Sequence, residues 1–363
     1  MKLDPRIPLS DEFLAEVQDS LDHFLNGQKD LLATTGDRLD MVWNEARHYC
    51  HGGKRMRPAF CYWGYVAVAG TEKEPPAGVM DVASSLDLLH LSALVHDDLI
   101  DNSDTRRGAP AAHRYFQAWH RKNRWQGDSE DFGRGTAILF GDMLFAWSMS
   151  MVEQAPVSTD RLRRARGYLD AMRTEVLAGQ FLDVVNQDKP LATDNLLRDA
   201  KLVMEYKTAK YTVSRPVQIG AALGLASDDT QQGLSRFGAH LGRAFQMRDD
   251  LLGIFGDPTV TGKPAGDDIR QGKKTVLIGY ALKAASPAAA ARLTVLLGDP
   301  NLDEGQIDQA RQILIDSGAA ETTEKEIEKE AASGMRHLSR LDLDSEGVYA
   351  LMALAHAAVE RTA

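Results

Sequence analysis

Cysteine is nearly absent from this chain of 363 residues. Cys50 and Cys61 are its only two, and they belong to no C-x-x-C or similar pattern. This scarcity indicates a reducing compartment and argues against a disulfide framework or a zinc site. The first residues, MKLDPRIPLSDEF, also lack the apolar core of a signal peptide. We therefore expect a cytoplasmic protein.

An excess of positive charge and a long apolar run are lacking as well. The formal net charge is −10 at pH 7, which argues against nonspecific binding to nucleic acid or to anionic membranes. The most hydrophobic segment, residues 82–100, carries Asp87, His90 and His96 and makes a poor membrane span. We expect no nucleic-acid partner and no stable membrane insertion. A phosphate-bearing ligand would need a local basic site.

The motifs of the common nucleotide-binding folds are missing too. The chain contains no GxGxxG and no strand–turn–strand pattern, and none of its Gly–Lys steps fits the GxxxxGK[ST] loop. Internal repeats, low-complexity tracts and linkers are also absent. An ATPase built on a parallel sheet is therefore not expected, and the chain is expected to fold as one domain spanning residues 1–363.

Helical periodicity is present almost everywhere. Residues 13–25 carry one apolar stripe, and Ser10 is placed to cap the helix that bears it. Residues 79–100 are apolar on nearly all sides, as expected of a helix central to a bundle. Residues 137–153 and 213–226 have the same character. These patterns predict a single all-α domain of ten or more helices.

Two further segments complete this prediction. Residues 307–314 form another amphipathic stripe, which is expected to end at Gly318. The most polar stretch, from His120 to Arg134, is expected to form a long surface loop.

Two acidic clusters follow apolar segments. The segment VHDDLIDNSDTRRG holds Asp97, Asp98 and Asp101, and the positions of Asp97 and Asp101 place them on one helix face. The segment QMRDDLLGIFGDP holds Asp249 and Asp250, beginning 152 residues after Asp97. Two acidic helix ends facing each other across a cavity would suit Mg²⁺, which takes a few carboxylates and completes its shell with water and phosphate oxygens. Taken alone, one Asp-Asp pair more often marks a solvated helix end.

Several basic groups strengthen the metal hypothesis. Arginine forks and lysine charges are what a diphosphate requires, and glycine beside lysine allows the backbone to approach an anion closely. Surface charges in loops are the alternative reading. The groups are Lys54, Arg55 and Arg57 in GGKRMRP, Arg106 and Arg107, Lys207 beside Thr208, Lys263 in TGKP, and Lys273 and Lys274 in QGKKT.

The ordered set of these motifs resembles the trans-isoprenyl diphosphate synthases, the polyprenyl synthetase family. The matching segments are GGKRMRP, HLSALVHDDLIDNSDTRRG, GTAILFGDML, GQFLD, YKTAKY, FQMRDDLLG and FGDPTVTGKPAGDDIRQGKKT. The resemblance implies an all-α fold with a central apolar cavity, usually in a homodimer. It also implies Mg²⁺-dependent head-to-tail condensation of isopentenyl diphosphate with an allylic diphosphate, so the substrates are the expected small-molecule partners.

The resemblance also assigns roles to individual residues. Asp97 and Asp101 would bind two Mg²⁺ ions on the allylic diphosphate, and Asp249 would bind a third. Asp98 and Asp250 would support these ligands. The other implied assignments are Arg106, Lys207 and Lys263 on the allylic diphosphate, Lys54, Arg57, His90 and Arg107 on isopentenyl diphosphate, Thr208 and Gln246 facing the carbocation, and Lys273 closing the site.

The chain departs from the family pattern at two places. Many members end the second acidic motif with an aspartate, as DDxxD, whereas here the motif reads DDLLG and Gly253 takes that place. We expect Asp249 still to bind metal, with the third ion held less tightly. The sequence GAPAAH also replaces the usual GxPTxH, which we interpret as minor.

Small residues on the helix before Asp97 bear on product length. Ser92 and Ala93 lie about one helical turn, roughly 5.4 Å, before it. Farnesyl-producing relatives often carry aromatic rings there, which form the floor of the cavity that holds the growing product chain. Because both residues are small here, we expect a lower floor and a twenty-carbon product, geranylgeranyl diphosphate. Farnesyl diphosphate and longer chains remain open. Other candidates for the floor are Ser85, Leu86, Leu88 and Leu89 on the same helix and Met143, Phe145 and Trp147 on the facing one.

Three other classes of protein are alternatives to a prenyltransferase. A class I terpene cyclase shares the fold and a DDxxD motif but needs no isopentenyl diphosphate site. A noncatalytic subunit of a heteromeric synthase need not keep both acidic clusters. A nonenzymatic helical scaffold gives no reason for paired acidic and basic clusters. The prenyltransferase is therefore the favoured hypothesis.

Overall fold

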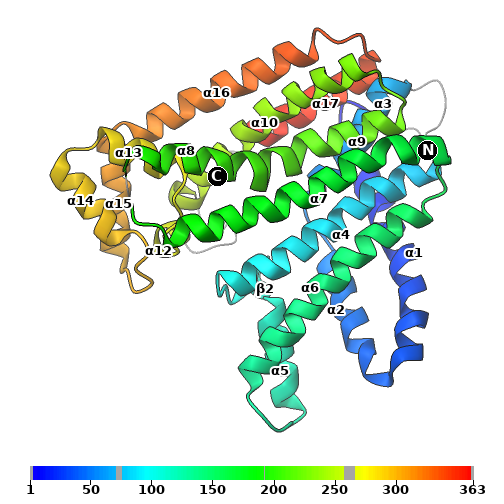
Figure 1. Ribbon diagram of the computed structural model, residues 1–363, viewed down its shortest axis with the longest axis horizontal. Coiled ribbons are helices and arrows are strands. Elements are labelled where there is room, and N and C mark those ends of the chain that lie inside the picture. The colour runs from blue at the N-terminus through cyan, green and yellow to red at the C-terminus, as the bar shows by residue number, and fades with distance from the viewer. Residues whose placement is uncertain (1–2, 71–75, 192, 257–265, 361–363) are drawn as a thin grey trace.

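The computed structural model describes residues 3–70, 76–191, 193–256 and 266–360, and the expected all-α fold is confirmed (Figure 1). Helices α12 and η1 are short, and η2 is a π-helix. The helices are α1 (Asp11–Thr35), η1 (Asp37–Leu39), α2 (Asp40–Cys50), α3 (Met56–Ala69), α4 (Ala77–Ile100), α5 (Ala112–Lys122), α6 (Ser129–Gln154), α7 (Thr159–Asp188), α8 (Thr193–Val203), η2 (Met204–Ser214), α9 (Arg215–Leu223), α10 (Asp228–Phe255), α12 (Asp267–Arg270), α13 (Val276–Ala284), α14 (Pro287–Leu296), α15 (Glu304–Asp316), α16 (Ala319–Leu338) and α17 (Ser345–Val359).

Local sequence accounts for where several helices begin and end. The Ser10 hydroxyl accepts a hydrogen bond from the Phe13 backbone N–H and caps α1, as expected. Helix α15 ends at Asp316, and Gly318, with φ of 72°, separates it from α16. The apolar stripe of residues 13–25 is buried in the core. These predictions are confirmed.

The apolar helix α4 lies inside the bundle. It packs on α6, α3 and α1, and its residues belong to the larger of two hydrophobic cores. The second core joins α8 and the C-terminal half of α10 to α13–α16. Helices α13, α14 and α15 form the left end of the molecule in Figure 1. By length and composition, α4 and α6 could each cross a membrane, but 72% of the apolar window of α4 is buried within the protein. A core helix of a soluble bundle passes the same test.

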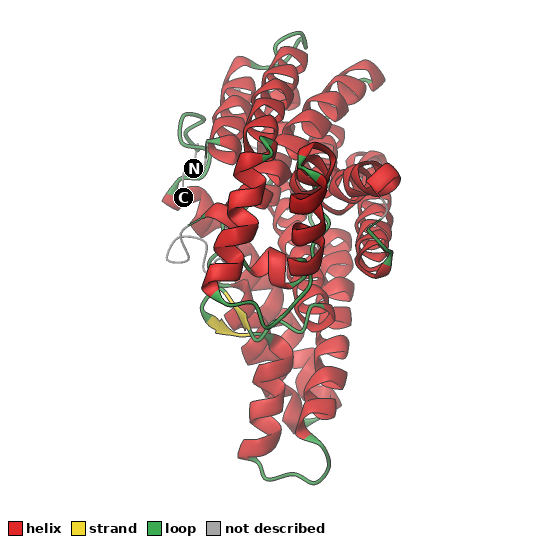
Figure 2. Ribbon diagram, turned by 90° about the vertical axis from the view of Figure 1, so that its left-hand side faces the viewer, coloured by secondary structure: helices red, strands yellow, loops and turns green. Residues whose placement is uncertain are grey.

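Two expectations about the segment after α4 were wrong. Strands β1 (Thr105–Arg106) and β2 (Ala109–Pro110) form a small antiparallel hairpin, visible in Figure 2, where no strand was expected. Arg107 and Gly108 make its turn, both with positive φ, as two-residue hairpin turns require. Two residues per strand are too few to produce an alternating pattern in the sequence.

The predicted loop from His120 to Arg134 is also mostly helical. Helix α5 continues to Lys122 and α6 begins at Ser129. The Asp128 carboxylate accepts hydrogen bonds from the backbone N–H groups of Glu130 and Asp131, so it caps α6 inside the polar stretch. The polar composition therefore reflects exposed helix ends instead of a loop.

Candidate active site

Two adjoining cavities open where α4, η2 and α10 meet. The larger has a volume of about 800 Å³ and extends between α4, α6 and α7. The smaller, about 600 Å³, extends towards α8 and α13. Residues from distant parts of the sequence line both of them, so the two acidic clusters do face one space. The residues common to both linings are Lys54, Leu94, Asp97, Lys207, Thr208, Gln246 and Asp249.

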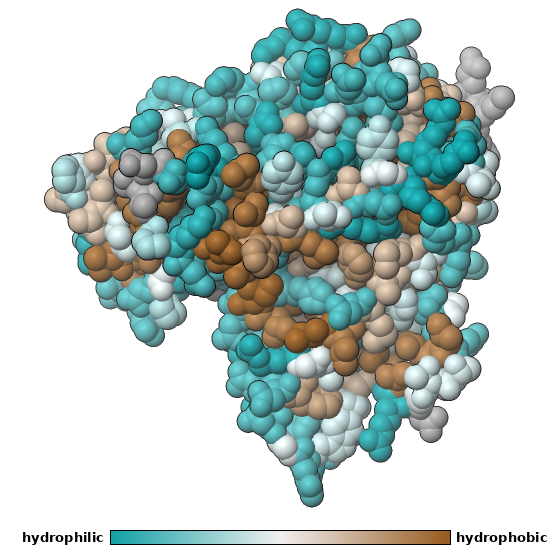
Figure 3. Space-filling view, in the orientation of Figure 1, coloured by the Kyte–Doolittle hydropathy of each residue, from teal (hydrophilic) through white to brown (hydrophobic). Residues whose placement is uncertain are grey.

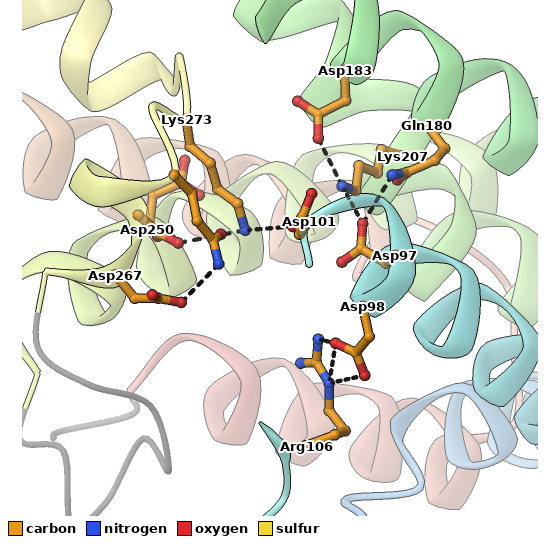
Figure 4. Close-up of polar contacts among 12 residues, drawn as sticks. Asp97, Asp98, Asp101, Arg106, Gln180, Asp183, Lys207, Asp250, Asp267 and Lys273 are labelled. Carbon is orange, nitrogen blue, oxygen red and sulfur yellow. Dashed lines mark hydrogen bonds and ion pairs between the residues drawn. The ribbon is translucent and has the colours of Figure 1, made fainter. Parts of the chain in front are cut away.

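Asp97, in the last turn of α4, receives two charged or polar donors (Figure 4). Gln180 Nε2 lies 2.9 Å from Asp97 Oδ1, and Lys207 Nζ lies 3.1 Å from the same oxygen. Lys207 Nζ also lies 2.7 Å from Asp183 Oδ2, so the ammonium bridges α4 and α7. Burial alone would raise the pKa of Asp97, but the charges of Lys207 and Lys273 lower that pKa to about 2. Asp97 is therefore ionised at neutral pH.

Asp101, one turn further, faces a second ammonium. Lys273 Nζ lies 3.7 Å from Asp101 Oδ2 and 3.5 Å from Asp268 Oδ1. Burial and the charge of Asp97 raise the pKa of Asp101, whereas Lys273 opposes that rise. Burial would lower the pKa of Lys273, but the surrounding aspartates, Asp268 first, raise it. Lys273 is thus a fixed cation among carboxylates.

These contacts fit a divalent cation. Two lysine ammonium groups already stand between four carboxylates from three segments, and carboxylate oxygens are the ligands that Mg²⁺ prefers. Within the described part of the chain, no three carboxylate or imidazole groups yet form a closed cage. Mg²⁺ does not need one, because it keeps waters and completes its shell with the oxygens of a substrate phosphate.

The second acidic cluster consists of two neighbouring residues on α10 whose surroundings differ. Asp249 lines both cavities. Asp250 is 7% exposed and accepts a 2.6 Å hydrogen bond from Gln246 Nε2. Burial raises the pKa of Asp250 to about 8, more than the Gln246 hydrogen bond lowers it. In the metal-free protein Asp250 is therefore mainly protonated at pH 7, and Asp249 is the better placed carboxylate.

Asp98 and Arg106 form a buried pair apart from the cavities. Asp98 is fully buried, and its two carboxylate oxygens lie 2.9 and 3.0 Å from Arg106 Nε (Figure 4). Neither residue lines either cavity. The structure thus does not bring Arg106 to the place expected of a diphosphate ligand. An ionised buried carboxylate needs a partner, and Arg106 serves Asp98 in that role.

The residues assigned to isopentenyl diphosphate do meet, all on the wall of the larger cavity. They are Lys54, Arg57, His90 and Arg107. Arg57 lies over the Tyr211 ring at 4.3 Å and donates to Thr212 Oγ1 at 2.9 Å, which fixes the direction of its guanidinium. Burial and the nearby arginines hold the pKa of His90 well below its usual range. His90 is thus a neutral side chain among cations.

A glycine makes room for Arg107. A Cβ atom at Gly53 would lie 2.8 Å from Arg107 Nη2, and Gly53 itself has φ of 92°. No other residue would fit there without displacing the guanidinium. The close packing of Arg107 therefore explains the glycine at position 53, directly before Lys54.

The remaining predicted residues fall into three groups. Lys207 and Thr208 lie on η2, where the wider π-helical backbone, often found at functional sites, passes close to Gly179 of α7. Lys274 lines the smaller cavity, and its ammonium donates to the backbone carbonyl groups at the end of α7. Lys263 lies outside the described residues.

Three residues of the site received no role from the sequence. Gln180 and Asp183 contact Asp97 and Lys207, and Asp268 contacts Lys273. All three stand in segments already noted as motifs, GQFLD and GKPAGDDIRQGKKT, so the polar residues of those motifs were the available signal.

Comparison with known proteins agrees with this geometry. The family model described as polyprenyl synthetase matches residues 40–314. The chain belongs to the polyprenyl synthetase family. The enzyme is 31% identical to the geranylfarnesyl diphosphate synthase of Aeropyrum pernix over 94% of this chain and 99% of the relative. It is 31% identical to a geranylgeranyl diphosphate synthase of Mycobacterium tuberculosis over 78% of this chain and 74% of the relative.

A solved structure gives the same result for the enzyme's fold. It is a geranylgeranyl pyrophosphate synthase from Corynebacterium glutamicum, complexed with isoprenyl diphosphate and magnesium. Its TM-score is 0.91 at 40% identity, and the match covers 97% of this chain and 99% of that one. The all-α isoprenoid synthase fold and the classification of the enzyme as a prenyltransferase are thereby confirmed.

Proposed function

We propose that the enzyme joins isopentenyl diphosphate head-to-tail to an allylic diphosphate and that its main product is geranylgeranyl diphosphate. The observation that carries this proposal is the arrangement of the larger cavity. Its wall holds the cation group of Lys54, Arg57 and Arg107, and its lining also includes Asp97 and Asp249, two of the aspartates that would bind metal. Two diphosphates can therefore bind side by side, one by arginines and one by metal ions.

Three Mg²⁺ ions would complete the site. Asp97 and Asp101 would hold two, and Asp249 would hold the third. When bound, these ions would supply positive charge to offset the negative charge of the allylic diphosphate as a leaving group. Lys207 and Lys273 would then exchange their carboxylate partners for diphosphate oxygens, since both ammonium groups lie among the same aspartates. Both lysines stabilise the leaving group by fixed positive charge.

The chain's own residues protect the carbocation. Thr208 and Gln246 line both cavities and present oxygen dipoles without a strong nucleophile. Leu89, Val176 and Phe245 contribute apolar surface that keeps water from the cation. The released diphosphate can accept the proton lost after carbon–carbon bonding, so no separate catalytic base is needed.

The depth of the larger cavity supports the twenty-carbon product. Ser92 and Ala93 line it, with Leu89 one turn deeper and Phe145 facing them from α6. Leu88 is buried in the core and does not line the cavity, and neither do Met143 and Trp147. Leu89 and Phe145 are thus the residues of the expected set that remain as the floor.

The product assay tests this proposal directly. Purified protein is incubated with Mg²⁺, labelled isopentenyl diphosphate and, in parallel, dimethylallyl, geranyl or farnesyl diphosphate, and the chain length is measured after removal of phosphate. We expect a dominant twenty-carbon alcohol. A fifteen-carbon alcohol would keep the reaction but contradict the assignment of the floor.

Two other outcomes would point to different functions. Cyclised hydrocarbons formed from the allylic substrate alone would identify a terpene cyclase. No incorporation with any primer would indicate that the chain requires a catalytic partner subunit.

We further propose a cytoplasmic homodimer. Large apolar side chains gather on the outward face of α6 and α7, where Figure 3 shows a hydrophobic band across the middle of the molecule. Phe181 is 70% exposed and Leu139 is 62% exposed, and an apolar patch of this kind marks a protein interface. A second copy would bring the same patch and cover it symmetrically. The patch consists of Ile138, Leu139, Met149, Leu177 and Phe181.

A further inference from the structure

We propose that Asp268 supplies the carboxylate that Gly253 lacks in the second acidic motif, and that it serves the third metal ion in its place. This inference rests on the proposed three-ion chemistry and adds one residue to it. Gly253 lies four residues after Asp249, so both face the same side of α10. An aspartate at position 253 would therefore point to the metal that Asp249 binds.

The space in front of Gly253 is filled by Asp268. A Cβ atom at position 253 would lie 2.1 Å from Asp268 Oδ2 and 3.0 Å from Asp268 Cγ. Both distances are too short for non-bonded atoms, so a side chain at 253 and the present position of Asp268 exclude each other. The carboxylate of Asp268 thus occupies the volume that a side chain at position 253 would fill.

The surroundings of this carboxylate match a metal-facing position. Asp268 lines the smaller cavity together with Asp249, Asp250 and Lys273. Its side chain is 15% exposed, and its Oδ1 atom lies 3.5 Å from Lys273 Nζ. Lys273 links it in turn to Asp101, which places Asp268 beside the carboxylates assigned to the metals. The missing aspartate is thereby replaced from α12, fifteen residues later in the chain than Gly253.

A purely structural role for Asp268 makes a different prediction. If Asp268 only positioned Lys273, Asp268→Ala would leave the Mn²⁺ affinities unchanged, because a lysine ammonium is not a metal ligand. If Asp268 serves the metal, the carboxylate can be moved from one position to the other. The exchange of Gly253→Asp with Asp268→Ala therefore separates the two roles.

The experiment measures metal binding as well as turnover. Mn²⁺ is titrated into the full-length protein in the presence of inorganic diphosphate, and electron paramagnetic resonance gives the number of bound ions and their dissociation constants. We expect Asp268→Ala to weaken one ion by about tenfold or more. The double variant, Gly253→Asp with Asp268→Ala, should recover most of that affinity.

Asp267→Ala is the matched control. It removes the neighbouring carboxylate, which accepts a hydrogen bond from Gln271 Nε2 at 2.9 Å and lines neither cavity. Its Mn²⁺ affinities should equal those of the wild type. Circular dichroism of every variant confirms that the helical fold is retained before its affinities are compared.

Several results would overturn the proposal. One is unchanged Mn²⁺ affinity in Asp268→Ala. Another is a loss that the folded double variant does not recover. A third is tighter Mn²⁺ binding by Gly253→Asp alone, because that would mean the two carboxylates do not compete for one space. Condensation is measured in the same samples. Wild-type protein that binds Mn²⁺ and diphosphate but forms no product would contradict the proposed function and not the metal role of Asp268.

Discussion

Asp97 and Asp98, adjacent at the end of α4, make different contacts because their side chains point in different directions. Asp97 faces the cavities, where Gln180 and Lys207 hold it, whereas Asp98 is buried against Arg106. The DDxxD motif therefore combines two proposed metal ligands, Asp97 and Asp101, with a structural ion pair at Asp98.

This difference predicts that substitution of Asp98 mainly lowers stability, whereas substitution of Asp97 mainly lowers turnover. Asp98→Ala leaves the Arg106 guanidinium without its buried partner, so the free energy of unfolding should fall by about 3 kcal/mol or more. Asp97→Ala should abolish turnover with little loss of stability, because Lys207 keeps its contact with Asp183. Urea unfolding and the product assay check the pair. Equal destabilisation by both variants would contradict the assignment.

Glu45 on α2 provides a pH-dependent element of stability. It is 3% exposed, and burial raises its pKa from the usual 4.5 to about 7. The folded protein therefore binds this proton more tightly than the unfolded chain does. Its contribution to the free energy of unfolding is greatest at low pH and is lost as pH rises from about 4.5 to about 7.

Replacing Glu45 with glutamine should remove this loss. Glu45→Gln keeps the shape of the side chain but cannot ionise, so at pH 8 it should be more stable than the wild type by about 1–3 kcal/mol. At pH 5 the two proteins should differ little. The measurement is urea unfolding at both pH values, and a stability difference independent of pH would refute the assignment to Glu45.

At the scale of elements, α4 carries both the proposed metal ligands and the proposed wall that limits the product. Ala93 and Ser92 lie four and five residues before Asp97, roughly 6 and 7.5 Å along the helix axis. The proposed product length therefore depends on how far along α4 the wall lies from Asp97.

Refilling this wall should shorten the product. Ser92 is 2% exposed and lines the larger cavity, so the ring in Ser92→Phe would occupy space needed by the growing chain. The main product should shift from twenty to fifteen carbons, measured by chromatography of the dephosphorylated alcohols. Ser84→Phe on the same helix is a useful comparison, because Ser84 is buried but lines neither cavity. An unchanged product from a folded Ser92→Phe would place the floor elsewhere.

The crossing of α3 and α9 depends on glycine. A Cβ atom at Gly220 would lie 1.8 Å from the Cys61 carbonyl oxygen, and one at Gly64 would lie 2.6 Å from the Val217 carbonyl oxygen. The two backbones therefore touch, which fixes the position of η2, and of Lys207 on it, relative to α3.

Gly220→Ala should separate these helices and lower the free energy of unfolding by about 2 kcal/mol or more. Gly167→Ala on α7 is the matched control, because a Cβ atom there meets nothing within 4 Å. It should stabilise the protein by about 0.5–1 kcal/mol through helix propensity. Denaturant unfolding of both variants checks the sign, and a harmless Gly220→Ala would show that the crossing can open freely.

At the scale of the whole molecule, the apolar band on α6 and α7 borders the larger cavity. Leu177 is 52% exposed on the band and also lines that cavity. A second copy covering the band would shield the cavity wall from water, which ties the proposed dimer to the chemistry.

A charge in the band should dissociate the dimer. Phe181→Asp places a carboxylate at the centre of the proposed interface, so the dissociation constant should rise by about a hundredfold, as expected when a central aromatic anchor is lost. Val295→Asp, on α14 and equally an exposed apolar side chain at 67%, should leave the assembly unchanged. Sedimentation velocity measures both. A wild-type monomer, or a Phe181→Asp dimer as tight as the wild type, would contradict the proposed interface.

Local patterns predicted most helices, but two features escaped them. The hairpin at Arg106 and Arg107 is too short to alternate, and the polar stretch after His120 contains helix ends capped by Asp128. In both cases a few specific hydrogen bonds outweighed composition. The charge and spacing of the motifs correctly predicted that Asp97 and Asp249 face one cavity. Spacing alone did not predict that Asp97 lines the cavities while Asp98 is buried against Arg106.

The sequence by itself determined the helical class, the two acidic clusters, the basic motifs and the resemblance to the polyprenyl synthetase family, because each is carried by short segments of residues close together in the chain. Only the tertiary structure decided which aspartates face the cavities, that Arg106 is held by Asp98, and that Asp268 fills the space before Gly253. Those outcomes depend on how distant helices approach one another, and packing of the whole core sets that approach.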